Sequence, residues 1–289
     1  MVPEVLVGLN CRSSRLYVDG TVGEGGHATA ILHRTNPDGQ LWGLDRDPAA
    51  LQAAAARLAH YTSRFRLFHR PYSELGELLQ EAGVSGVAGI MLDLGLSLFQ
   101  LQQSGRGFSF KQDEPLDMRF DPEDPGPTAA EILNAASESE LEQIFREFGE
   151  EPRARRLARL IVQIRRQSPF ETTGQLVRAA YQALGQSSRR HRIHPATRAF
   201  QALRIAVNRE LELLGQFLAQ VPDWLETGGR LVVISYHSLE DRVVKHQMQA
   251  WNRTGVMRML TRKPLSPALD EIHRNPRARS AKLRVAERS

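Results

Sequence analysis

Short apolar runs and helix-like stretches alternate over the first part of the chain and again near its C-terminus. Each run is bounded by glycine, proline or an acidic residue, whereas the stretches between the runs repeat apolar positions every three or four residues. Alternation of this kind predicts an α/β protein with a mostly parallel sheet. The predicted strands are 16–18, 41–44, 64–69, 89–93 and 229–235, with an edge strand in the tail 275–288, where Ala281, Leu283 and Val285 alternate with polar residues.

The alternation stops between residues 104 and 201, where no strand pattern is found. Pro122, Pro125 and Pro127 exclude a helix near the start of this region. Helical patterns follow, at 128–135, 137–147, 151–166, 172–184 and 195–219. We therefore expect a core formed by 1–103 and 202–289, and an inserted all-helical subdomain for substrate recognition at 104–201. We expect 252–274 to be a loop.

The predicted helix 195–219 has an apolar face and a separate polar stripe. The apolar residues recur at steps of three and four and predict burial on one side. The polar stripe consists of Arg198, Gln201, Arg204 and Asn208. Such a stripe is compatible both with a solvated surface and with contact to a nucleotide.

Charge is distributed unevenly along a chain whose formal net charge is +5. Between Arg153 and Arg209 the basic residues are all arginine or histidine, and Glu171 is the one acid. Arg189, Arg190 and Arg192 lie together in one predicted loop. The planar guanidinium suits phosphate, so this region favours RNA or DNA over a merely solvated helix face.

The composition of the 289 residues excludes several classes of protein. Cys11 is the single cysteine, so no intrachain disulfide can form and a reducing compartment fits. No apolar run has membrane-spanning length, and the N-terminus has no signal pattern, which favours a cytoplasmic protein.

We expect no metal site, because no cluster has metal-ligand spacing. His237, Glu240 and Asp241 come nearest, but Glu240 and Asp241 are neighbours on a predicted helix and diverge in direction. Ser238 and Asp241 fit a helix-capping box instead.

A glycine-rich loop between the first predicted strand and the following helix is the strongest chemical signal. Asp19 ends the strand, and Gly23, Gly25 and Gly26 follow in an Asp-x-x-x-Gly-x-Gly pattern. Glycines let the backbone approach a ligand, and the N–H groups that open the helix would point at it. Asp45 ends the next strand, where an acid can accept hydrogen bonds from ribose hydroxyls. The spacing fits S-adenosylmethionine better than a dinucleotide.

Asp93 ends a third predicted strand, so three acids are expected at the same edge of a parallel sheet. No nucleophile stands out, which favours a cofactor that delivers an activated group, such as a methyl group. If the acceptor is an exocyclic base amine, a carboxylate that accepts its N–H would stabilise the charge that develops there. Asp93 is the candidate, and a purely cofactor-binding or loop-binding role is the alternative.

Phe108 and Phe110 lie in the turn-rich segment 105–110. Aromatic side chains in such a loop can stack on an unpaired RNA base. Packing within the insert explains them equally well.

Taken together, these motifs resemble the bacterial ribosomal RNA small subunit methyltransferase H family. The matching segments cover nearly the whole chain in order: 19–27, 43–48, 93–97, 100–101, 106–110, 115–119, 194–198, 200–205, 207–208, 237–242 and 275–280. The resemblance implies a class I methyltransferase fold with an inserted helical domain. It also implies transfer of a methyl group from S-adenosylmethionine to N4 of a cytidine in the 16S rRNA of the small ribosomal subunit.

Carried over position by position, the resemblance implies a set of cofactor contacts. They are Gly25, Gly26 and His27 in the glycine loop, Asp45 at the ribose, Tyr72 near the adenine, and Asp93 and Gln100 near the methyl-donor end.

The chain departs from the family pattern in two places. It opens Met1-Val-Pro-Glu-Val-Leu, without the family's His-x-Pro-Val-Leu-Leu segment, and it has Leu98 and Gln102 where the family tends to have serine and an acid. Two alternatives stay open: a nucleotide-dependent oxidoreductase, and a non-catalytic RNA-binding or ribosome assembly factor that keeps the fold. The sequence also leaves the oligomeric state open, with a homodimer as one option.

Overall fold

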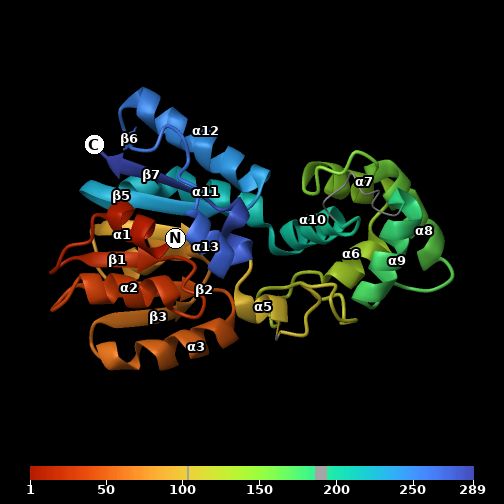
Figure 1. The fold of residues 1–289 in the computed structure, drawn as a ribbon, viewed down its shortest axis with the longest axis horizontal. Coiled ribbons are helices and arrows are strands. Elements are labelled where there is room, and N and C mark those ends of the chain that lie inside the picture. The colour runs from red at the N-terminus through yellow and green to blue at the C-terminus, as the bar shows by residue number, and fades with distance from the viewer. Residues whose placement is uncertain (103, 186–193) are drawn as a thin grey trace. The chain divides into compact units, whose positions relative to one another are not determined.

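The computed structural model describes residues 1–102, 104–185 and 194–289. The chain forms two compact units, a core of Met1–Gly95 with Leu211–Ser289 and an insert of Leu96–Glu210 (Figure 1). The insert thus takes in more of the chain at both ends than the predicted 104–201.

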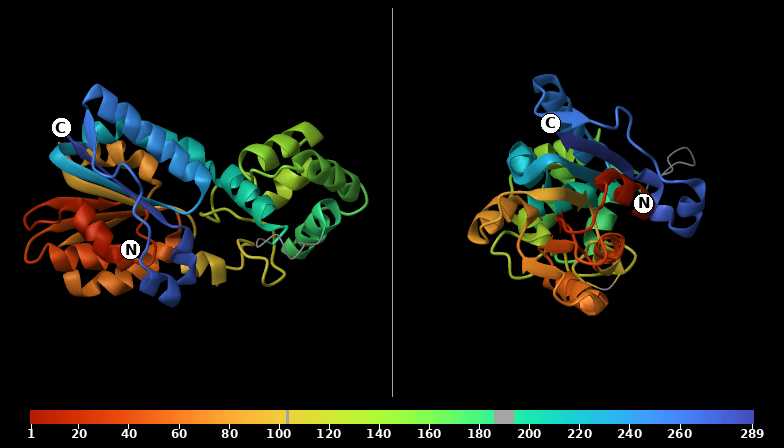
Figure 2. Two further views of the ribbon diagram at one scale, coloured as in Figure 1. Left: turned by 45° about the horizontal axis from the view of Figure 1, so that its top comes forward. Right: turned by 90° about the vertical axis from the view of Figure 1, so that its left-hand side faces the viewer.

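In the described part of the core, seven strands form a single sheet in the order β3-β2-β1-β4-β5-β7-β6 (Figures 1 and 2). Every neighbouring pair from β3 to β5 is parallel, and β7 runs antiparallel to both β5 and β6. The strands are β1 Leu16–Asp19, β2 Gln40–Asp45, β3 Phe65–His69, β4 Val87–Asp93, β5 Leu225–Ser235, β6 Met257–Met259 and β7 Lys282–Arg288. The predicted α/β class with a mostly parallel sheet is confirmed.

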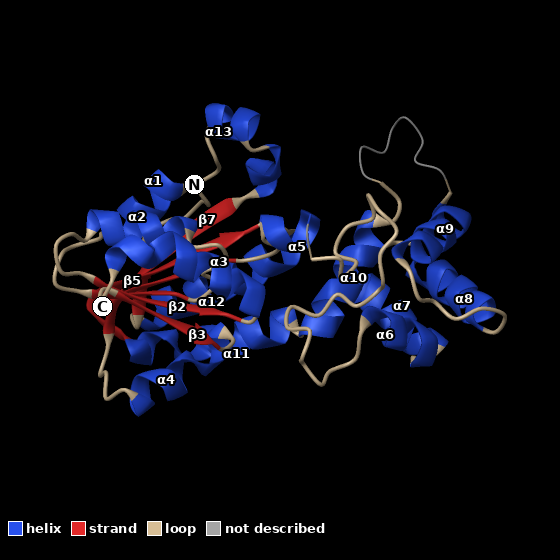
Figure 3. Cartoon of the chain, turned by 90° about the horizontal axis from the view of Figure 1, so that it is seen from below, coloured by secondary structure: helices blue, strands red, loops and turns tan. Residues whose placement is uncertain are grey.

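Successive strand residues pack into different apolar layers on the two faces of the sheet, as the pleat of a β-strand requires. Val18, Ile90 and Leu92 face a layer built with α4, α11 and α12. Tyr17 and Met91 face a layer built with α1, α2 and α3. Figure 3 shows α1 and α2 on one side of the strands and α4 and α11 on the other. The bounds are α1 Val2–Leu9, α2 Gly26–Arg34, α3 Pro48–Leu58, α4 Leu75–Glu81, α11 Glu210–Trp224, α12 Ser238–Thr254 and α13 Leu269–Arg274, with the 3₁₀ turns η1 Ala59–Tyr61, η2 Tyr72–Glu74 and η3 Pro276–Ser280.

The C-terminal region corrects two predictions. The strand expected in the tail 275–288 is not at an edge, because β7 lies between β5 and β6. Its partner β6 and the helix α13 both fall within 252–274, which we expected to be a loop. The sequence pattern missed β6 because this strand is only three residues long.

In the described part of the insert, helices surround an apolar core of their own. They are α5 Leu98–Gln102, α6 Ala129–Ala135, α7 Glu138–Glu147, α8 Ala154–Arg165, α9 Thr173–Leu184 and α10 Thr197–Asn208. Thr128 with Glu131, and Ser137 with Glu140, form capping boxes that start α6 and α7. The helix predicted at 195–219 is broken at Arg209, which adopts the left-handed conformation with φ 51°.

Candidate active site

The glycine loop connects β1 to α2 and is held by backbone hydrogen bonds to both neighbouring strands. Gly20 N–H donates to Met91 O on β4, and Val22 N–H donates to Leu44 O on β2, each at 2.9 Å. Gly23 and Gly25 have φ of 51° and 80°, where other residues would be strained. The loop therefore fixes Gly25 as the N-cap of α2, and Gly26 and His27 as its first residues.

Asp45 turns toward this loop from the end of β2. Its Oδ2 accepts Gly23 N–H at 2.8 Å, and its Oδ1 accepts Asp47 N–H at 2.9 Å. Burial raises the pKa of Asp45 to about 6, even though both backbone donors favour the ionised form. The carboxylate is half-buried, and its contact with a ribose stays a prediction.

Asp19 is the most buried of the three strand-end acids, with 1% exposure. Its Oδ1 accepts Thr21 N–H at 3.2 Å, whereas its Oδ2 has no hydrogen-bond partner among the described residues. Burial, together with the nearby Asp93 and Asp45 carboxylates, raises its pKa to about 8. A buried polar atom without a partner is costly unless a ligand supplies one.

Asp93 lies at the end of β4 with a hydrogen-bond partner or an ion-pair partner at each carboxylate oxygen. The hydroxyl of Tyr236 donates to Oδ1 at 2.9 Å, and His27 Nδ1 lies 3.5 Å from Oδ2. The Asp93 backbone N–H donates to Thr21 Oγ1 at 2.6 Å. Burial raises the pKa of Asp93, although its side chain keeps 26% exposure and can still be reached by a substrate.

His27 connects the glycine loop to Asp93. Burial lowers its pKa, while the Asp93 carboxylate acts in the opposite direction. A neutral imidazole that keeps its proton on Nδ1, toward Asp93, leaves Nε2 as an acceptor. That Nε2 is buried and has no partner in the part of the chain that the structure describes. Like Asp19 Oδ2, it is an unsatisfied polar atom at this edge of the sheet.

Two residues of this cluster were not among the predicted site residues. Tyr236 directly follows β5, the strand next to β4, so its place at the same sheet edge could have been predicted from the strand order. Thr21 lies within the glycine loop, but nothing in its sequence context distinguishes it from other loop residues.

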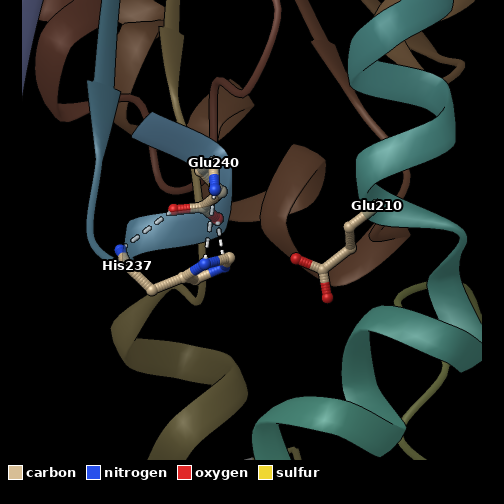
Figure 4. Close-up of side chains that lie close together, drawn as sticks. All are labelled: Glu210, His237 and Glu240. Carbon is tan, nitrogen blue, oxygen red and sulfur yellow. Dashed lines mark hydrogen bonds and ion pairs between the residues drawn. The ribbon is translucent and has the colours of Figure 1, made fainter. Parts of the chain in front are cut away.

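The start of α12 is capped by His237 and Glu240, not by the predicted Ser238 and Asp241. Glu240 N–H donates to His237 Nδ1, and His237 Nε2 lies 3.0 Å from Glu240 Oε1 (Figure 4). Both pairs have the three-residue spacing of a capping box, so the sequence could not separate them. Asp241 instead binds Arg284 and Lys282 of β7, at 2.7 and 3.0 Å, so Glu240 and Asp241 diverge as predicted.

The two other predicted cofactor contacts lie in different units. Tyr72 begins η2 beyond β3, and its ring packs edge-on against Phe217 with the centroids 5.2 Å apart. A Cβ at Gly20 would lie 3.0 Å from Tyr72 Cβ, so the tyrosine is next to the glycine loop. Gln100 belongs to the insert, where its Oε1 accepts Ser97 N–H and its own N–H donates to Ser97 Oγ. Its role at the cofactor stays a prediction.

The insert aromatics pack against the insert itself. Phe108 is buried and stacks on Phe120, with the centroids 5.7 Å apart. Phe110 is half-buried, stacks on His194 at 4.4 Å and meets the edge of Phe200 at 5.1 Å. The packing interpretation accounts for both rings, and base stacking by either ring stays a prediction.

The polar stripe of α10 is likewise occupied within the insert. Asn208 is 1% exposed; its Oδ1 accepts Phe120 N–H at 2.8 Å, and its Nδ2 donates to Met118 O at 2.7 Å. Arg204 forms two bonds with Glu210, at 2.7 and 3.0 Å. The Asn208 amide thus ties the loop before α6 to α10, and its contact with RNA stays a prediction.

The predicted arginine contacts have different outcomes. Arg198 keeps 43% of its side chain exposed and lies 3.7 Å from Glu151. Arg189, Arg190 and Arg192 lie outside the described residues. Their contact with RNA stays a prediction.

Among the described helices, none is long and apolar enough to span a membrane.

Comparison with known proteins gives a consistent result over the full length of the chain. The sequence model described as "MraW methylase family" matches residues 1–289. Three similar curated proteins are each named ribosomal RNA small subunit methyltransferase H. They come from Cyanothece sp. (51% identity, 98% of this chain and 92% of the relative), Geobacter sulfurreducens (48%, 100% and 97%) and Desulfosudis oleivorans (46%, 97% and 95%).

Proposed function

The chain belongs to the MraW methylase family, and from that premise we propose that it methylates N4 of a cytidine in 16S rRNA of the small ribosomal subunit, using S-adenosylmethionine. The names of the relatives support an rRNA methyltransferase acting on the small subunit. The choice of cytidine N4 follows from the motif resemblance. An enzyme with this substrate would act in the cytoplasm.

The residues at the strand ends fit the proposed cofactor. Asp19 Oδ2 and His27 Nε2 are buried polar atoms without partners among the residues described, and both lie beside the glycine loop. Asp45 faces that loop as the candidate for the ribose hydroxyls, and Tyr72 lies beside it as the candidate for the adenine. Gly25, Gly26 and His27 open α2, whose first N–H groups would face the ligand.

When bound, S-adenosylmethionine supplies a methyl group already activated by its sulfonium. The protein must therefore align the acceptor amine and stabilise the charge that develops on it. Asp93 is placed for this task, because its carboxylate is partly exposed and can accept an N–H of the amine. Methyl transfer would form an N–C bond as the S–C bond of the donor broke, and the amine would then lose one proton. Burial raises the pKa of Asp93, which suits it to take that proton.

Tyr236 and His27 act on Asp93 as positioning residues. The Tyr236 hydroxyl donates to Oδ1, and His27 approaches Oδ2, so the carboxylate is held from both sides. This three-residue cluster at the end of β4 is the observation that carries the catalytic proposal. A non-catalytic RNA-binding factor would have no need for an acid held in this way beside unsatisfied acceptors.

Mass mapping of modified nucleotides in 16S rRNA tests the proposal. We expect one cytidine to gain a methyl group when the RNA is incubated with the wild-type protein and S-adenosylmethionine, and no gain with Asp93→Ala. RNA that binds tightly to the wild type but stays unmethylated would favour the assembly factor. Tighter binding of NAD than of S-adenosylhomocysteine would favour the oxidoreductase.

A further inference from the structure

A second set of arginines, in the C-terminal part of the core, lies near the edge of the sheet where the parallel strands end. β7 is antiparallel to β5, and its first residue, Lys282, pairs with Ser235, the last residue of β5. The parallel strands end at that edge, so the chain just before Lys282 arrives beside Tyr236 and Asp93. Lys282 also binds Asp241 in the first turn of α12, at 3.0 Å.

This basic segment, residues 262–279, carries more cations than anions. Arg262, Lys263, Arg274, Arg277 and Arg279 are all exposed, and the acids of the segment are Asp270 and Glu271. Neither Arg277 nor Arg279 has a side-chain hydrogen bond or ion pair with any described residue. In η3 the two flank Ala278, which is only 4% exposed. The buried alanine anchors the turn while both guanidinium groups stay in solvent.

The segment is bonded to β7 near its start, and local backbone hydrogen bonds hold the turns near its end. Leu265 and Leu283 exchange two hydrogen bonds of 2.9 Å. Asn275 N–H donates to Glu271 O at 2.7 Å, and Ala281 N–H donates to Ala278 O at 2.8 Å. Arginines on such an anchored turn lose less freedom on binding a partner than arginines on a free tail.

Electrostatics places α13 near the site as well. Burial raises the pKa of Tyr236, and the carboxylates of Asp93 and Glu271 raise it further. Burial lowers the pKa of His27. The Asp93 carboxylate acts in the opposite direction, and the Glu271 carboxylate also raises this pKa. α13 therefore lies close enough to the catalytic cluster for its charges to be felt there.

The site itself is unfavourable to a polyanion. Asp45 and Asp93 place two acids where a nucleotide must enter, beside Asp19, whose pKa burial raises to about 8. A cationic rim beside such a site offsets the repulsion and raises the local concentration of the substrate. A single target base at this edge also brings the phosphates of its own strand close to the rim.

We propose that Arg277 and Arg279 bind backbone phosphates of the RNA strand that carries the target base, holding that strand at the site edge of the core. This inference rests on the proposed function and deepens it, because it places an RNA contact on the core and not only on the insert. Phosphate contacts of this kind fix position and carry no base specificity.

The test compares two double variants with equal changes in charge. Arg277→Glu/Arg279→Glu reverses the charge of the two proposed phosphate ligands. Arg12→Glu/Arg253→Glu reverses the charge at two exposed positions, one before β1 and one in the last turn of α12. Both positions lie at the other end of the strands from the site. Binding of a 16S rRNA transcript is measured across a salt series, together with KM and kcat for methyl transfer. Titration with S-adenosylhomocysteine shows whether each variant keeps its folded core.

For Arg277→Glu/Arg279→Glu we expect the Kd and KM for RNA to rise at least about tenfold, with little change in kcat. The slope of log affinity against log salt should fall by about 0.7 for each phosphate that the variant no longer neutralises, if the strand is unpaired. Arg277→Lys/Arg279→Lys should keep most of that slope, and the control pair should bind RNA as the wild type does.

An unchanged Kd and salt slope in Arg277→Glu/Arg279→Glu, with cofactor binding intact, would overturn the inference. An equal loss of affinity in the control pair would also overturn it, because it would indicate a general effect of net charge. A loss of affinity for assembled subunits but not for bare RNA would overturn it as well, because it would indicate a protein partner. If the wild type methylates no RNA at all, the proposed function fails and this inference fails with it.

Discussion

The strand ends of the core and the polar face of α10 in the insert both carry polar side chains, but the hydrogen-bonding groups of the two regions are satisfied differently. At the strand ends, Asp19 Oδ2 and His27 Nε2 are buried without partners among the described residues. On α10, Asn208 and Arg204 have their polar atoms engaged by the insert's own loop and helix ends. From the sequence alone, both regions are predicted to be candidate contacts to a ligand.

The difference separates a binding site from a scaffold. Burying a polar group without a partner costs roughly 1–3 kcal/mol, so a fold keeps such groups where a ligand will satisfy them. A polar group that is fully paired within its own unit stabilises that unit and has little left for a partner. Each of the following variants tests one side of this contrast.

Asp93→Asn should have the largest effect on activity. The amide keeps the shape but loses the negative charge that stabilises the acceptor amine, so kcat should fall by about 10²–10³. The measurement is the initial rate of methyl incorporation into 16S rRNA. Affinity for S-adenosylhomocysteine is the control and should change far less. A kcat within a factor of about three of wild type would remove Asp93 from the chemistry.

Asn208→Ala should have the largest effect on the insert and none on the cofactor site. It leaves Phe120 N–H and Met118 O without their amide partner, which should destabilise the insert by about 2–3 kcal/mol. Thermal unfolding measures this loss of stability. Arg198→Ala is the matched control, because its side chain is largely exposed and should cost much less. Equal stability of Asn208→Ala and wild type would contradict the structural role.

Tyr236→Phe should have a smaller effect, seen mainly in the pH profile. The hydroxyl that this variant removes donates to ionised Asp93 and lowers its pKa, so its removal should raise that pKa. We expect the acidic limb of the profile of kcat against pH to move to higher pH, with kcat reduced about tenfold or less at neutral pH. A profile of unchanged shape would mean that Tyr236 does not act through Asp93.

The pH dependence of cofactor binding should give the smallest effect. Burial raises the pKa of Asp45 to about 6 in the free protein. Ribose hydroxyls donate to the ionised form, so affinity for S-adenosylhomocysteine should rise with pH up to about 6 and level off above it. Below about 6 it should fall by up to about tenfold per pH unit. The affinity is measured by calorimetric titration at each pH, and in Asp45→Asn it should no longer change between about pH 5 and 7. A wild-type affinity that is independent of pH would refute the assignment of Asp45 to the ribose hydroxyls.

The strand-end acids could be predicted from sequence because the signal is local. Apolar runs that stop at Asp19, Asp45 and Asp93 indicate three strand ends, and parallel strands bring such ends to one edge. Tyr236 completes the cluster from β5, far along the chain. Only the strand order, with β5 beside β4, brings it to Asp93.

The role of Asn208 could not be predicted, because a polar position on a helix has the same pattern whether it faces solvent or a loop. Its partners Phe120 and Met118 precede it by 88 and 90 residues. The break at Arg209 was missed for a related reason, since the apolar spacing continues through it into α11 while the backbone does not.

The most direct test of the cofactor site is a calorimetric titration of S-adenosylhomocysteine into the wild-type protein and into Asp45→Ala. A methyl-donor site at the strand ends predicts saturable one-to-one binding by the wild type and an affinity at least about a hundredfold weaker in the variant. Equal affinities, or no binding to the wild type, would contradict it.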